Sequence, residues 1–201
     1  MPLVGPVLGA GILAKFAQFG FTGAQATNFA MAVGNGVVNN ILATNLYVGT
    51  GVGTGPGAGV GTGKVSGVVG PIVGQNIYTF MVAKGFSGSQ LLNKSMAIGM
   101  AFAEHITALG IVNSISAPTA VGVGTGVIQG VIGIPMGQMI FTFFSASGFT
   151  GAQALNEALA IGEGIALSMT TAIVNTTIVG VPAPPPTGPV PIGGVDNGKL
   201  I

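Results

Sequence analysis

The chain has 201 residues, of which 4% are charged, and its five basic and four acidic residues leave a formal net charge of +1. This balance offers no basic surface for nucleic acid and no acidic surface for a basic partner. The sequence contains no Cys, which excludes disulfides and thiolate metal sites. A monomer with so few charges would be poorly soluble.

The mean hydropathy of +0.78 raises the question of a membrane. A spanning helix needs about 20 predominantly apolar residues, whereas residues 23–44 include several Gln, Thr and Asn side chains. We therefore expect burial in a protein assembly and do not favour membrane contact. The alternative is a membrane protein packed through small residues, either a pore or a membrane-inserted factor. The N-terminus lacks the basic region of a signal peptide, so secretion by that route is not expected.

A six-residue motif, Gly-Phe-Thr/Ser-Gly-Ala/Ser-Gln, occurs at residues 20–25, 85–90 and 148–153. The similarity between the copies extends well beyond the motif on both sides, which indicates three tandem units. The expected boundaries are 1–65, 66–130 and 131–181, followed by a Pro-rich C-terminal arm at 182–201.

Each unit is predicted to begin with a helical hairpin. The first helix starts near Pro6, Pro71 or Pro135, because proline suits the first helical turn, and it ends at the first Gly of the motif. The second helix starts with a capping box, in which a hydroxyl and a Gln satisfy backbone N–H groups and the preceding Phe acts as a hydrophobic staple. The predicted capping residues are Thr22 and Gln25, Ser87 and Gln90, and Thr150 and Gln153.

Small residues recur at intervals of four along the second helix of each unit, which predicts a face where another helix backbone approaches closely. The predicted close-packing residues are Ala30 and Gly34, Ser95 and Gly99, and Ala158 and Gly162.

Glycine alternates with β-branched residues at 48–63 and 121–127, which places all the glycines on one face of a strand. A flexible Gly-Thr linker is the alternative. The arm at 182–191 is rich in proline, so we expect it to lie extended along a neighbouring subunit or to form a loose tail. The fold class is therefore mainly α with short Gly-rich β segments, arranged as three helical hairpins around a pseudo-threefold axis.

No pattern of catalytic, cofactor-binding or metal-binding residues is present. His105 is the only histidine, and it follows Glu104, but adjacent helical residues point about 100° apart. We interpret this pair as a polar spot at a subunit contact. The run from Gly57 to Lys64 mimics a phosphate loop, but Val65 stands where the magnesium-binding hydroxyl is required. An enzyme and a small-molecule substrate are therefore not expected.

The charge-poor composition, rich in Gly, Ala and Asn, and the tandem repeats together resemble minor virion structural proteins of tailed bacteriophages and related contractile particles. The resemblance implies a non-enzymatic structural subunit, found in a virion or comparable extracellular particle, whose partners are other subunits. A chain of three repeats could cap or plug a threefold tail hub, baseplate or spike, as PAAR-type spike tips do. Only this geometry carries over, because the Pro-Ala-Ala-Arg motif and its metal ligands are absent.

Overall fold

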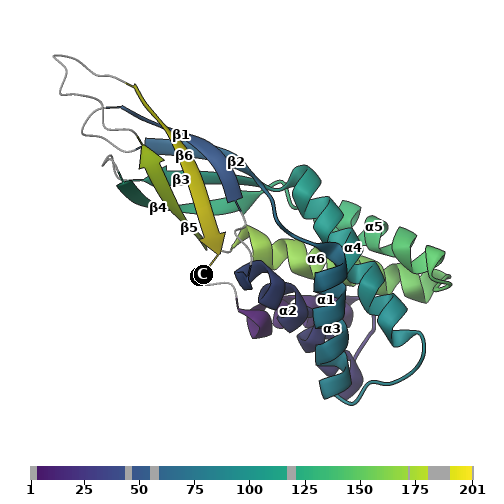
Figure 1. The fold of residues 1–201 in the computed structure, drawn as a ribbon. Coiled ribbons are helices and arrows are strands. Elements are labelled where there is room, and N and C mark those ends of the chain that lie inside the picture. The colour runs from purple at the N-terminus through teal and green to yellow at the C-terminus, as the bar shows by residue number, and fades with distance from the viewer. Residues whose placement is uncertain are drawn as a thin grey trace.

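The computed structural model describes residues 4–43, 47–54, 59–116, 121–171, 173–180 and 191–200. Within them, two helices and two strands follow one another three times. The helices are α1 (Gly5–Gln18), α2 (Ala24–Ala43), α3 (Gly70–Ala83), α4 (Leu91–Leu109), α5 (Gly133–Ala146) and α6 (Ala152–Thr170). The strands are β1 (Tyr47–Thr54), β2 (Gly59–Val65), β3 (Ile111–Ser116), β4 (Val121–Gln129), β5 (Ile173–Gly180) and β6 (Pro191–Leu200). Helices gather at one end of the molecule and strands extend from the other (Figure 1).

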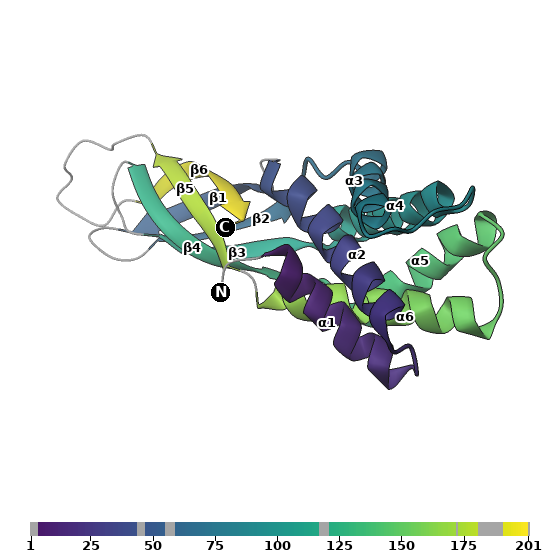
Figure 2. The same cartoon turned by 90° about the horizontal axis from the view of Figure 1, so that it is seen from below.

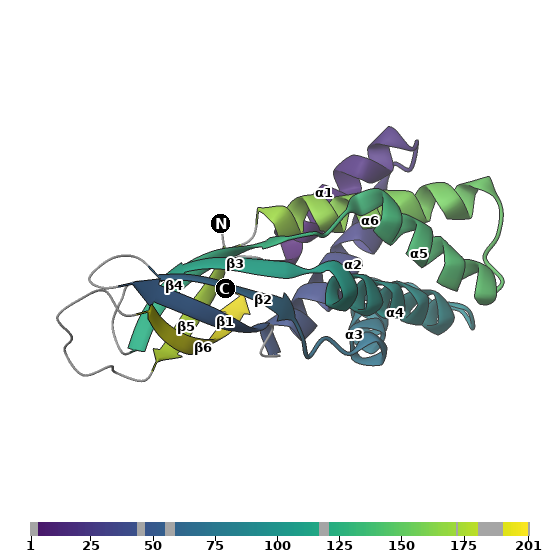
Figure 3. The same ribbon diagram turned by 90° about the horizontal axis from the view of Figure 1, so that it is seen from above.

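The helices pair as three hairpins, and the hairpins close into a ring. Each helix packs against the next along the chain, and α6 packs back against α1. An ion pair of 2.8 Å between Lys15 and Glu163 joins these two helices. The first and last units are therefore neighbours, which an open stack of repeats would not allow. Views from opposite sides show the strands leaving the same end of the ring (Figures 2 and 3).

The core of the ring follows a spacing of four residues along α2, α4 and α6, which places these side chains on one face of each helix. They are fully buried in one continuous hydrophobic core. In repeat-equivalent groups they are Val33, Ile98 and Ile161; Val37, Phe102 and Ile165; and Ile41, Ile106 and Met169.

The six strands form a closed antiparallel sheet in chain order, with β6 pairing back to β1. The glycines of β1 and β2 lie opposite each other, as at Gly49↔Gly63 and Gly51↔Gly61. The register places them on the same face as Val65, Val112 and Ile128, which are buried. Because six strands enclose a narrow interior, we attribute the glycine face to lack of room for side chains. The Gly-rich segments are therefore strands where they are described, and not linkers.

The extended arm predicted at 182–191 lies outside the described residues except for Pro191. Within the C-terminal segment 182–201, residues 191–200 form β6, which pairs with both β5 and β1. The physical reason is that β6 satisfies the backbone groups that two sheet edges would otherwise expose. Pro191 stands at the first position of the strand, where proline is tolerated.

Candidate functional site

The repeated motif ends the first helix of each hairpin. Gly20, Gly85 and Gly148 have φ angles of +83°, +85° and +87°. The Phe that follows each of them donates its backbone N–H to a carbonyl five residues earlier, as from Phe149 to Phe144 at 2.9 Å. The rings of Phe144 and Phe149 also lie in contact, with centroids 5.7 Å apart. This is the Schellman arrangement with its hydrophobic contact, so the motif Phe closes the preceding helix and is not the predicted staple of the following one.

The predicted capping boxes are wrong for α4 and α6. The residues before these helices are Gln90 and Gly151, and neither helix has a side-chain cap hydrogen bond. In the first unit, α2 begins at Ala24, two residues after Thr22. The reason is the second motif glycine, which has a positive φ in every copy, +91° at Gly151. It turns the chain between the hydroxyl and the helix.

This geometry predicts very unequal losses of stability for two adjacent substitutions. Thr150→Ala should change the free energy of unfolding by less than about 0.5 kcal/mol, because Thr150 is exposed and caps nothing. Gly151→Ala should cost about 2 kcal/mol, since φ +91° and ψ 174° form a region that is essentially restricted to glycine. Denaturant unfolding of both variants measures the difference. A larger loss for Thr150→Ala than for Gly151→Ala would restore the capping interpretation.

The predicted close-packing residues lie where the two helices of each hairpin meet. A Cβ added to Gly34 would stand 2.5 Å from the Gly5 carbonyl oxygen, and Gly99 and Gly162 face the backbones of α3 and α5 in the same way. Ala30, Ser95 and Ala158 are fully buried one turn away. The Ser95 hydroxyl donates a hydrogen bond of 2.9 Å to the Leu91 carbonyl.

At the end of the ring away from the sheet, three side chains at one repeat-equivalent position converge. They are Phe29, Lys94 and Glu157, which we call the central cluster. Lys94 Nζ lies 2.6 Å from Glu157 Oε1 and 2.8 Å from its Oε2. The same Nζ lies 5.0 Å from the ring centroid of Phe29. The side chains of Lys94 and Glu157 are 22% and 18% exposed, so this ion pair is largely covered.

Each member of the central cluster also lies beside the motif Phe of the next unit. The rings of Phe29 and Phe86 meet edge to face at 6.1 Å. Lys94 Nζ lies 5.7 Å from the ring centroid of Phe149. Glu157 shares a pocket with Phe21, the motif Phe of the first unit. The motif therefore frames the cluster, a role that the sequence alone did not indicate.

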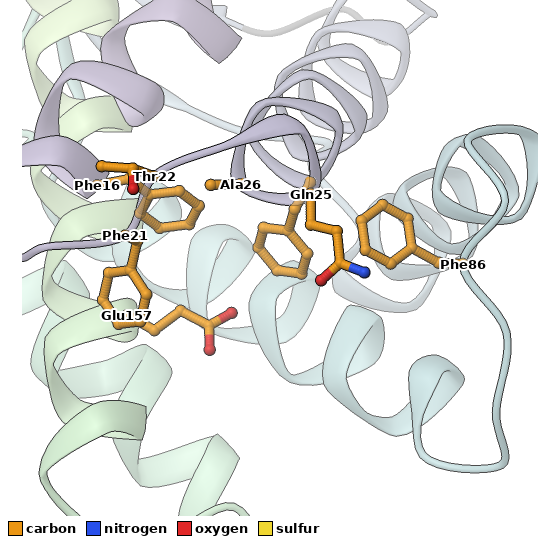
Figure 4. A pocket seen from close by; sticks show the side chains of 8 residues that line it. Phe16, Phe21, Thr22, Gln25, Ala26, Phe86 and Glu157 are labelled. Carbon is orange, nitrogen blue, oxygen red and sulfur yellow. The ribbon is translucent and has the colours of Figure 1, made fainter.

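The pocket beside Glu157 has a volume of about 240 Å³. The Glu157 carboxylate and the Gln25 amide lie between the rings of Phe21 and Phe86 (Figure 4). The lining residues come from all three units: Phe16, Phe21, Thr22, Gln25, Ala26, Phe29, Phe86 and Glu157. None of them is positively charged, but Lys94 contacts both oxygens of Glu157 from outside the lining, so the pocket presents an ion-paired carboxylate among aromatic rings.

A second pocket holds the opposite charge. It is lined by Lys94 and Phe149 together with the second motif, Ser87, Gly88, Ser89, Gln90 and Leu91. The residues that line the second pocket are largely the repeat equivalents, one unit along the chain, of those that line the first. The central cluster contributes Glu157 to the first pocket and Lys94 to the second.

His105 lies at the other end of the helices and is 1% exposed. Its Nε2 accepts a hydrogen bond of 3.2 Å from the backbone N–H of Ile132, the residue before α5. Burial lowers the pKa of His105 below its usual 6.5. The neighbouring Glu104 is exposed. The two side chains therefore face different surroundings, and His105 serves the contact between two hairpins within one chain.

The described residues contain no group of three His, Asp or Glu side chains that could hold a metal ion. The part of the phosphate-loop mimic that is described, residues 59–64, is extended in β2 and not a loop before a helix. No helix in the described part of the chain is both long enough and apolar enough to cross a bilayer.

Comparison of the chain with family models, with curated proteins and with solved structures gives no match.

Proposed function

We propose that this chain is a non-enzymatic structural subunit of a large assembly, such as the virion or contractile tail of a bacteriophage. In this proposal its three hairpins stand around a pseudo-threefold axis and cap or plug a threefold element such as a tail hub or spike. Its partners are other protein subunits.

The pseudo-threefold arrangement is supported by cyclic contacts. The contact from Phe29 to Phe86 in the first unit corresponds to that from Lys94 to Phe149 in the second. Glu157 and Phe21, which line one pocket, close the cycle from the third unit to the first. The closed ring of helices is consistent with rotation between units and not with simple translation. Superposition of the three hairpins by a rotation near 120° is the expected result, and any other relation contradicts it.

The observation that carries the structural role is an exposed apolar residue at the same place in each unit. Val4, Val69 and Ile132 precede α1, α3 and α5 and are 42%, 44% and 55% exposed. Leu109 and Ile111 add further exposed apolar surface where α4 meets β3. We call these five residues the junction belt, because they lie where helices meet strands. We place the contact with partner subunits at these exposed apolar side chains, because they recur at one position in every unit.

We expect the isolated chain to self-associate as its concentration rises, because the junction belt has no partner there. The triple variant Val4→Glu, Val69→Glu and Ile132→Glu should remain monodisperse with little change in thermal stability, since the three side chains are exposed. Analytical ultracentrifugation over a concentration series measures the effect. The matched control is Val82→Glu with Leu92→Glu, which changes two exposed apolar residues outside the belt.

The assembly itself is tested with purified particles from the source. Mass spectrometry should find the chain in them, and wild-type chain should incorporate where the triple variant does not. A wild-type chain that stays monomeric at all concentrations and is absent from particles would overturn the proposal.

A further inference from the structure

We infer that the pocket beside the central cluster is a binding site for an arginine side chain of a neighbouring subunit. The inference rests on the proposed function in one respect, namely that a partner protein supplies the arginine. The sequence contains no arginine, so none of its own residues supplies the guanidinium.

The walls of the pocket suit a flat cation. Phe16, Phe21, Phe29 and Phe86 contribute ring surfaces, and the face of an aromatic ring carries the negative end of its quadrupole. A guanidinium stacks on such faces while donating hydrogen bonds within its own plane. The Glu157 carboxylate and the Gln25 amide lie between two of these rings and provide acceptor oxygens (Figure 4).

The carboxylate retains capacity for a second cation. Lys94 Nζ contacts both oxygens of Glu157, at 2.6 and 2.8 Å. An ionised carboxylate has about four lone-pair sites, so each oxygen can accept a further hydrogen bond. A guanidinium that approaches through the pocket would share Glu157 with Lys94 without displacing it.

The second pocket provides an internal comparison. It occupies the corresponding place one unit along the chain, where Lys94 stands in the place of Phe29 and no carboxylate lines the pocket. A cation would be repelled by Lys94 in that pocket. Lys94 and Glu157 offset each other's charge, but the ion pair presents its carboxylate to the first pocket and its ammonium group to the second. A cation should therefore prefer the first pocket to the second.

The site can be tested with N-acetyl-arginine methylamide as the probe. It is titrated into the full chain carrying the triple junction-belt substitutions, with ¹³C-labelled Phe observed by NMR. The expected result is a saturable shift of the Phe21 and Phe86 signals that the uncharged citrulline analogue does not produce. The junction belt lies at the opposite end of the helices, so failure of either proposal leaves the other standing.

Three variants sharpen the test. Glu157→Gln should weaken arginine binding about tenfold, which corresponds to about 1.4 kcal/mol. Glu163→Gln is the matched control, because it removes the other ion-paired carboxylate of α6, and it should leave binding unchanged. Phe86→Leu removes one aromatic wall without touching the ion pair and should also weaken binding. The NMR spectra report whether each variant is folded.

Absence of saturable shifts at tens of millimolar probe would overturn the inference. Equal binding by Glu157→Gln and wild type would do the same, as would equal shifts with arginine and citrulline. An equally strong shift of Phe149, beside the second pocket, would show that the cation does not distinguish the two pockets and would also contradict it.

Discussion

Gly99→Ala should lower the free energy of unfolding by about 3 kcal/mol, the upper part of the range for inserting a methyl group into a packed core. The added Cβ would lie 2.7 Å from Gly74 Cα and also against the Gly74 nitrogen. Both neighbours are backbone atoms, so α3 and α4 would have to separate. The usual gain of about 1 kcal/mol from replacing glycine by alanine in a helix is too small to offset this. Urea denaturation measures the loss.

The matched control exchanges the same residue types in the other direction, two positions along α4. Ala101→Gly removes a fully buried methyl group and should cost about 2 kcal/mol, shared between helix propensity and lost burial, without pushing two backbones apart. A Gly99→Ala chain as stable as wild type would mean that the α3–α4 contact is looser than the structure shows.

The helical part of the fold could be predicted from the sequence because the repeat displays it three times. Proline near each start and glycine at each first-helix end both agree with the structure. The small residues at the helix contact were also identified by spacing alone, since only glycine permits the approach seen at Gly34.

The closed sheet could not be predicted to the same extent. The Gly-alternating strands β1, β2 and β4 carry a clear period of two, but β3 and β5 lack it. β6 begins with proline and contains Gly193-Gly194 and Asn197-Gly198, which read locally as turns. Its pairing with β1 and β5 is a long-range effect, in which closing two edges outweighs local preference.

The central cluster was missed for a different reason. Phe29, Lys94 and Glu157 share one repeat position but no chemical class, so a search for similarity between copies passes over them. The sequence did contain one indication of the cluster, because a lysine and a glutamate of opposite charge stand at equivalent positions of two units. Only 4% of the residues are charged, so Lys94 and Glu157 stand out once the three copies are aligned. They can form an ion pair because the helices close into a ring, which brings the equivalent positions of different units together.

The three contacts between neighbouring hairpins are not equal. Gly36 and Gly164 bring α2 and α6 against Ile77 of α3 and Ile12 of α1, where an added Cβ would lie 2.6 Å from backbone atoms. The equivalent residue in α4 is Ala101, which carries a methyl group where the other two helices have glycine. The α4–α5 contact is the least extensive of the ring. The hydrogen bond from Ile132 to His105 spans this weaker contact.

The stability of the chain should therefore fall as the pH drops below about 6.5. Burial lowers the pKa of His105 in the folded state, so the unfolded chain takes up a proton first and folding is fully favoured only above the unfolded value. Protonation also removes the acceptor that binds the Ile132 N–H. Between pH 7.5 and 5.5 we expect a loss of about 1 kcal/mol, within the limit of about 1.4 kcal/mol per pH unit for one proton.

His105→Asn isolates this effect, because Asn40 is the buried residue at the equivalent position of the first unit. His105 is the only histidine of the chain, and no other side chain ordinarily titrates between pH 5.5 and 7. The variant should therefore show a nearly constant free energy of unfolding across that range, whatever its absolute stability. Urea denaturation at closely spaced pH values gives both curves. Parallel curves for the variant and the wild type would show that His105 does not carry the pH dependence, and the weaker α4–α5 contact would then have to be held by packing alone.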